Sequence, residues 1–140
     1  MSRRRARRGS AATELALTAG LLVTLAVGFA EIGHLQDLGA VVGSVAADAA
    51  ATGADVLDPT LPMTGAAMVA AAEQRATDGL ADAGIACGVG CVVSATFTTV
   101  GGYNAVEVTV DVPYDAWTNL PFAPGSVRRV SVALTKLQDP

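Results

Sequence analysis

Histidine, cysteine and aromatic residues are scarce in this sequence of 140 residues, and each scarcity limits what the chain can do. His34 is the single histidine, and the sequence contains no Ser-His-Asp set, no glycine-rich phosphate loop and no metal-ligand spacing. We therefore expect no catalytic residues, no metal site and no cofactor, and hence no enzyme. Aromatic residues make up only 4% of a chain that is 51% apolar, so any globular core is small and lightly packed.

Charge is distributed unevenly along the chain. Five of the nine basic residues lie within the first eight positions, whereas all 13 acidic residues lie beyond Gly9. A basic cluster by itself is compatible with nucleic-acid binding, but the acidic remainder repels a phosphate backbone, so we expect no nucleic acid among the partners. An apolar run follows the arginines almost at once, which is the arrangement of a targeting signal.

No charged residue interrupts residues 15–30. As a helix this run covers about 24 Å, somewhat less than the roughly 30 Å of a bilayer core. Extension back to Ser10 and forward to Ile32 closes the gap and includes Glu14 and Glu31 near the two ends, where a charge can reach the interface. The positive-inside rule keeps the arginines in the cytoplasm. We therefore expect a single-pass membrane protein whose N-terminus is cytoplasmic and whose C-terminal domain is extracytoplasmic.

Three interpretations of this N-terminal segment compete. The first is an ordinary secretory signal with a small-x-small cleavage site at residues 28–30, and the second is a plain uncleaved anchor. The third uses Gly9, which ends the basic leader, and Glu14, which follows five residues later. Neither ordinary interpretation has a use for Glu14, because a carboxylate at the edge of an apolar helix weakens insertion.

The run Arg-Arg-Gly-Ser-Ala-Ala-Thr-Glu-Leu-Ala-Leu, then the apolar stretch and Gly-Phe-Ala-Glu-Ile-Gly, resembles the TadE/TadG-like pseudopilins associated with tight-adherence (Tad/Flp) pili. The resemblance covers about the first fifty residues and continues weakly into the C-terminal strands. It implies that a prepilin peptidase cuts after Gly9, leaving Ser10 as the new N-terminus and Glu14 as the fifth mature residue. Many family members have an aromatic residue after the glutamate, where this chain has Leu15.

The resemblance also implies a function. It is that of a TadE-like minor pseudopilin, a structural component in the assembly of a type IVb (tight-adherence/Flp) pilus or a related secretion apparatus. The implied partners are the membrane, other pilins or pseudopilins, the pilus assembly machinery and the prepilin peptidase. The alternative is a membrane-tethered or secreted extracytoplasmic binding domain unrelated to pili.

Glu14 has a different role under each function. A carboxylate held in an apolar bundle needs an opposite charge, and cleavage after Gly9 creates one in the α-amine of Ser10. Glu14 of one subunit then pairs with Ser10 of its neighbour and fixes the axial register of an assembly. In a chain that stays monomeric, Glu14 simply reaches the headgroups.

The first helix is expected to continue beyond the membrane, because residues 31–51 contain no proline and are rich in alanine and valine. Small residues recur there at a spacing of about four, which lets two helices approach closely or merely lines a helix surface. They are Gly39, Gly43, Ala46 and Ala50. Thr52-Gly53 is expected to end the helix, and the prolines beyond it indicate a linker. The chain thus divides into a basic leader (1–9), a membrane helix with its extracytoplasmic extension (10–51), a linker (52–64) and a small extracytoplasmic domain (65–140).

The predicted domain is of the α+β class. Thr64 is expected to cap a second helix over residues 65–83, and Gly84 is expected to stop it. Strands are expected over residues 91–100, 103–112 and 126–137, with Gly101-Gly102 as a hairpin turn between the first two. Alternation assigns the inward face to Val106, Val108, Val110 and Val112 of the middle strand, and to Val130, Val132 and Leu134 of the last. A second helix beside a three-stranded antiparallel sheet makes a small α+β domain.

Cys87 and Cys91 are the two cysteines, and both lie beyond the apolar run. An exported pair is more often a disulfide than a metal site, although two reduced thiols remain the alternative. Three residues separate the pair, so it is not a C-x-x-C redox motif, and the two glycines between them let the chain fold back sharply.

The loop over residues 113–125 holds three aromatic residues, Tyr114, Trp117 and Phe122. Aromatic side chains in a loop indicate either a binding patch or a cover that folds over the open face of a small sheet.

Overall fold

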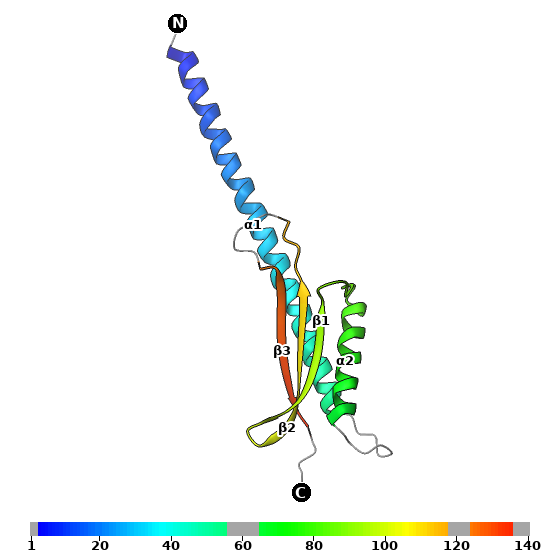
Figure 1. Cartoon of the computed structure of the whole chain (residues 1–140). Coiled ribbons are helices and arrows are strands. Elements are labelled where there is room, and N and C mark those ends of the chain that lie inside the picture. Colours follow the sequence, from blue (N-terminus) through cyan, green and yellow to red (C-terminus); the bar gives the residue numbers. More distant parts are fainter. Residues whose placement is uncertain (1–2, 56–64, 118–123, 136–140) are drawn as a thin grey trace.

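A single helix, α1 (Arg3–Ala54), extends along most of the molecule in the computed structural model (Figure 1). The structure describes residues 3–55, 65–117 and 124–135, with side chains from Ala12 onward. The other elements are α2 (Gly65–Asp82), β1 (Val92–Val100), β2 (Tyr103–Pro113) and β3 (Ser126–Leu134). They confirm the predicted α+β class, with a long N-terminal apolar helix, a second helix and a three-stranded antiparallel sheet.

The end of α1 lies at Ala54, slightly beyond the stop that the sequence predicts. Gly53 serves close packing rather than termination. A Cβ placed on it would lie 2.8 Å from the Cβ of Ala72 and 2.9 Å from the carbonyl oxygen of Met68. Because only glycine lets α2 come this near, the helix passes through Gly53, and both Gly53 and Ala54 are buried.

The end of α2 is a Schellman cap. Gly84 has a φ of 74°, its N–H donates to the carbonyl oxygen of Ala81, and the N–H of Ile85 donates to that of Leu80, both at 2.9 Å. Ile85 then packs against the core. The predicted stop at Gly84 is confirmed, whereas the predicted cap, Thr64, lies outside the described residues.

The sheet has the order β1-β2-β3, with antiparallel neighbours. Gly101 and Gly102 have φ values of 60° and 86°, and two positive values in a two-residue turn match the twist of the flanking strands. The strands run beside the C-terminal half of α1, and α2 lies next to β1 (Figure 1). The alternating valines of β2 are buried, as predicted.

The inward face of β3 is the opposite of the predicted one. The residues expected inside are 44 to 55% exposed: Val130, Val132 and Leu134. Val127 is buried instead, and Ala133 packs against the core. Register explains the difference, because Ala133 lies opposite Val106 and Val127 lies opposite Val112, and directly opposed residues share a face of the sheet.

The core lies between the helix-facing side of the sheet and the two helices. Its largest fully buried side chains are Leu80, Val42, Val106, Val108 and Val110. Alanines of both helices supply much of the rest, among them Ala46, Ala50, Ala72 and Ala76. Since each buried methylene contributes only about 0.8 kcal/mol, such small side chains stabilise the domain modestly.

Candidate functional site

The N-terminal half of α1 protrudes from the domain (Figure 1). The large apolar side chains of residues 12–30 are exposed. Leu15, Leu17 and Phe29 are each 71 to 76% exposed. An apolar surface of this extent marks contact with a membrane or with another protein. The helical segment Ala12–Ala54 is long and apolar enough to cross a membrane, which agrees with the predicted membrane helix.

Glu14 is the single acidic residue of this protruding segment, residues 12–30, and it lies near the beginning. The Thr18 hydroxyl donates to the carbonyl oxygen of Glu14 at 2.8 Å. Gly9 and Ser10 belong to the same helix, and Ser10 precedes Glu14 by about 6 Å along its axis. Cleavage after Gly9 and the assembly role of Glu14 both remain predictions.

Four side chains meet where the protruding half of α1 enters the domain. Glu31 and His34 come from α1, and Tyr114 and Trp117 come from the segment after β2; we call this group the junction. Glu31 and Tyr114 are buried, and the Tyr114 hydroxyl donates to the carbonyl oxygen of Glu31 at 3.5 Å. The His34 ring stacks on Trp117 with centroids 5.0 Å apart and an interplanar angle of 18°, and its centroid is 5.9 Å from that of Tyr114.

The surroundings of Tyr114 at the junction change the pKa of its hydroxyl. Burial raises the pKa of its hydroxyl above the ordinary value of 10.0, and the nearby Glu31 raises it further. Both causes disfavour a tyrosinate ion, so the hydroxyl keeps its proton at neutral pH and remains a hydrogen-bond donor to the α1 backbone.

The aromatic segment packs against α1, and the interpretation as a binding patch stays a prediction. Tyr114 and Trp117 lie against α1, not over the open face of the sheet. Phe122 lies outside the described residues. His34 and Trp117 are far apart in the sequence, and no local pattern indicates that they stack.

The stripe of small residues on α1 is covered from within the chain. A Cβ on Gly39 would lie 2.6 Å from Nη2 of Arg129, a β3 residue, and one on Gly43 would lie 3.9 Å from its Cδ. The Nε of Arg129 donates to the carbonyl oxygen of Gly39 at 3.2 Å. Ala46 and Ala50 are buried in the domain core. The stripe thus packs on its own domain and is not a free face for a second helix.

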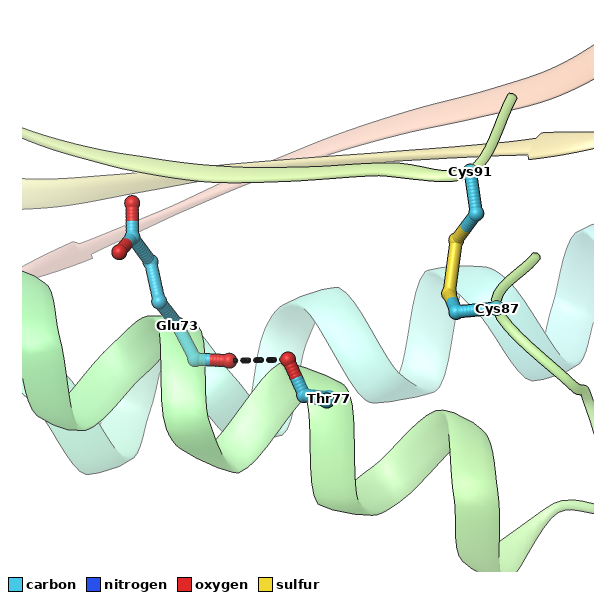
Figure 2. Close-up of a disulfide and its surroundings, with 4 residues drawn as sticks. All are labelled: Glu73, Thr77, Cys87 and Cys91. Atoms are coloured by element: carbon cyan, nitrogen blue, oxygen red, sulfur yellow. Dashed lines mark hydrogen bonds between the residues drawn. A yellow bond between two sulfur atoms is a disulfide. The ribbon is translucent and has the colours of Figure 1, made fainter. Parts of the chain in front are cut away.

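Cys87 and Cys91 are joined at disulfide-bonding distance, with their Cα atoms 5.2 Å apart, as the sequence predicts (Figure 2). Gly90 between them has a φ of 99°, a value that favours glycine. The N–H of Cys91 donates to the carbonyl oxygen of Gly88 at 3.3 Å. The bridge closes the connection between α2 and β1, and it leaves Val89 fully exposed at its tip.

Glu73 of α2 closes part of the outer edge of β1. Its Oε1 accepts a hydrogen bond from the N–H of Ala95 at 3.1 Å, and Figure 2 shows the carboxylate directed from α2 toward the strand. No local pattern in the sequence indicates that Glu73 borders an edge strand.

No group of three or more His, Cys, Asp or Glu side chains is placed to share a metal ion within residues 12–55, 65–117 and 124–135. The features that the structure does bring together are the exposed apolar helix with Glu14 near its beginning and the aromatic junction at its other end.

Comparisons of the chain with protein-family models, with curated proteins and with solved structures found no match. The function of the protruding helix, of Glu14 and of the junction is therefore inferred from this chain's own residues.

Proposed function

We propose that the chain is a TadE-like minor pseudopilin, a membrane-anchored structural subunit in the assembly of a tight-adherence pilus or a related secretion apparatus. The observation that carries the proposal is α1, one unbroken helix in which residues 12–30 are exposed and mostly apolar, whereas its C-terminal half lies in the core of a small domain. Because a continuous helix joins them, the domain keeps a fixed distance and rotation relative to the apolar half. Ordered assembly of subunits needs such rigid coupling, and a tethered binding domain does not.

The leader sequence supports processing by a prepilin peptidase. Cleavage after Gly9 removes five of the nine basic residues and creates an α-amine on Ser10. This amine supplies a cation in the apolar layer for the carboxylate of Glu14. Pairing between the Ser10 amine of one subunit and Glu14 of its neighbour fixes the axial register of a stack, whereas pairing within one subunit does not.

The orientation follows from charge and cysteine chemistry. Arginines at the start of the chain hold that end in the cytoplasm, so the domain lies on the extracytoplasmic side. A disulfide between Cys87 and Cys91 is compatible with that side, since an oxidising compartment preserves it.

The first experiment determines the mature N-terminus of membrane-extracted protein by intact mass and N-terminal sequencing. We expect a start at Ser10, and Gly9→Ala should reduce cleavage while insertion is retained. A start at Met1 would instead support the plain anchor, and a start at Glu31 the secretory signal.

The second experiment tests Glu14. Glu14→Gln keeps the shape and removes the charge, so insertion should be unchanged or slightly better while association with other pilins is lost. Asp37→Asn is the matched control, because Asp37 is an exposed acid of the same helix outside the apolar half. Cross-linking in membranes and a pilus count on cells report the outcome. Wild-type assembly of Glu14→Gln at wild-type protein levels would leave a tethered domain unrelated to pili.

A further inference from the structure

We propose that the junction is a docking surface for lipid headgroups, which holds the base of the domain at the surface of the membrane that α1 crosses. The inference rests on the membrane placement of α1 in the proposed function, and not on cleavage at Gly9 or on pairing of Glu14. The partner is the headgroup layer of the extracytoplasmic leaflet, and the principal contact residue is Trp117.

The position of the junction along α1 is the first argument. At 1.5 Å per residue, the helix rises about 30 Å from Glu14 to His34, which equals the thickness of a bilayer core. When His34 and Trp117 lie at the outer headgroups, Glu14 therefore lies at the opposite boundary. The arginines of the leader then fall beyond that boundary, on the cytoplasmic side.

The burial of Glu31 is the second argument. This carboxylate lies three residues before His34, about 5 Å toward the membrane, where contact with lipid would be unfavourable. Only 4% of Glu31 is exposed, and Tyr114 packs beside it. At this depth Glu31 would otherwise lie close to the acyl chains. The segment after β2 thus shields its carboxylate from lipid.

The chemistry of Trp117 is the third argument. Trp117 is 68% exposed although His34 stacks on its ring, so a large part of this amphipathic residue faces outward from a supported position. Tryptophan and tyrosine favour this headgroup depth, because one end of each ring is apolar and the other is polar. Asp115, exposed in the same segment, limits how deeply the segment can enter, since a carboxylate stays in water.

Trp117 is the only tryptophan of the chain, so its fluorescence reports on the junction alone. The full-length protein is reconstituted into phosphatidylethanolamine–phosphatidylglycerol vesicles that carry lipids brominated either near the glycerol or near the chain end. We expect a blue-shifted emission, stronger quenching by bromine near the glycerol than near the chain end, and no change on dilution with lipid. Glu14→Gln should give the same quenching profile, which separates this proposal from the assembly function.

The matched control moves the reporter to the far end of the domain. Tyr103→Trp combined with Trp117→Phe places the indole beside the β1–β2 hairpin, away from the protruding half of α1 (Figure 1). Acrylamide in the water should quench this control, and brominated lipid should not. Two results overturn the proposal: quenching of Trp117 by acrylamide with none by brominated lipid, or protection from both quenchers that disappears on dilution, which identifies a second copy of the chain as the occupant.

Discussion

Gly53→Ala should destabilise the domain, although alanine is normally the better helix former. The new methyl group would lie 2.8 Å from the Cβ of Ala72, 2.9 Å from the carbonyl oxygen of Met68 and 3.2 Å from Cγ1 of Val106. Two of these atoms belong to the framework of α2 and cannot rotate away. The helices must therefore separate locally, and the core around them must shift.

The magnitude follows from two opposing terms. Overpacking of a well-filled core typically costs about 1–3 kcal/mol, and replacing glycine by alanine within a helix returns at most about 1 kcal/mol. The difference is a net loss of about 0–2 kcal/mol, and the contact with the backbone carbonyl oxygen of Met68 places Gly53→Ala toward the upper end of that range. For a domain of this size, each 1 kcal/mol lowers the melting temperature by roughly 4–8 °C.

The assay is thermal unfolding of the full chain in detergent, followed by the fluorescence of Trp117, which reports on the contact between the domain and α1. Gly43→Ala is the matched control, because its methyl group would meet only the Arg129 side chain at 3.9 Å, an ordinary contact distance. That variant should be neutral or slightly stabilised. Equal melting temperatures for Gly53→Ala and Gly43→Ala would refute the close-packing role of Gly53.

Three further predictions concern the disulfide, β3 and the junction. Cys87→Ser should lower the free energy of unfolding by about 2 kcal/mol, as closure of so short a loop implies, and urea unfolding with and without reductant measures it. Arg129→Ala should cost about 1 kcal/mol through the lost bond to Gly39 and the lost packing, and Arg129→Met, which keeps most of the stem, should cost less; equal losses would contradict a packing role. Since burial and then Glu31 raise the pKa of Tyr114, the folded state holds this proton more tightly than the unfolded state. The contribution of Tyr114 to stability should therefore be constant below pH 10.0 and should be lost as pH rises from there through the folded-state pKa, and Tyr114→Phe should reduce that loss in urea titrations.

The elements with strong local signals could be predicted from the sequence. The valines of β2 alternate with polar residues on a central strand whose one face is buried, so periodicity and burial agree. Gly84 and the pair Gly101-Gly102 adopt positive φ, which glycine accommodates without strain, and both turns lie where the sequence places them.

Features that depend on contacts between distant segments could not be predicted. Val130 and Val132 alternate along β3 as an apolar face, yet the register with β2 places the opposite face of β3 toward the helices. That face includes Arg129, whose long side chain covers Gly39 and Gly43 of α1. Glycine is a residue type that commonly ends a helix, so the sequence around Gly53 indicates a stop. Its role in close packing becomes visible only when α2 is placed against it. His34 and Trp117 stack although they are far apart in the sequence. The residues next to either of them in the sequence therefore give no indication of this contact.

The continuity of α1 also determines how the molecule carries mechanical load. Tension applied to the protruding half passes into the domain along the axis of one helix, without a hinge to absorb it. The strands run beside that axis (Figure 1), so the force shears α1 past the sheet instead of peeling it away. In shear, the buried contacts of Val42, Ala46, Ala49 and Ala50 are loaded at the same time, whereas peeling would load them one after another. The small side chains of the core give a modest free energy of unfolding. In this geometry they resist a force along α1 better than that free energy alone suggests.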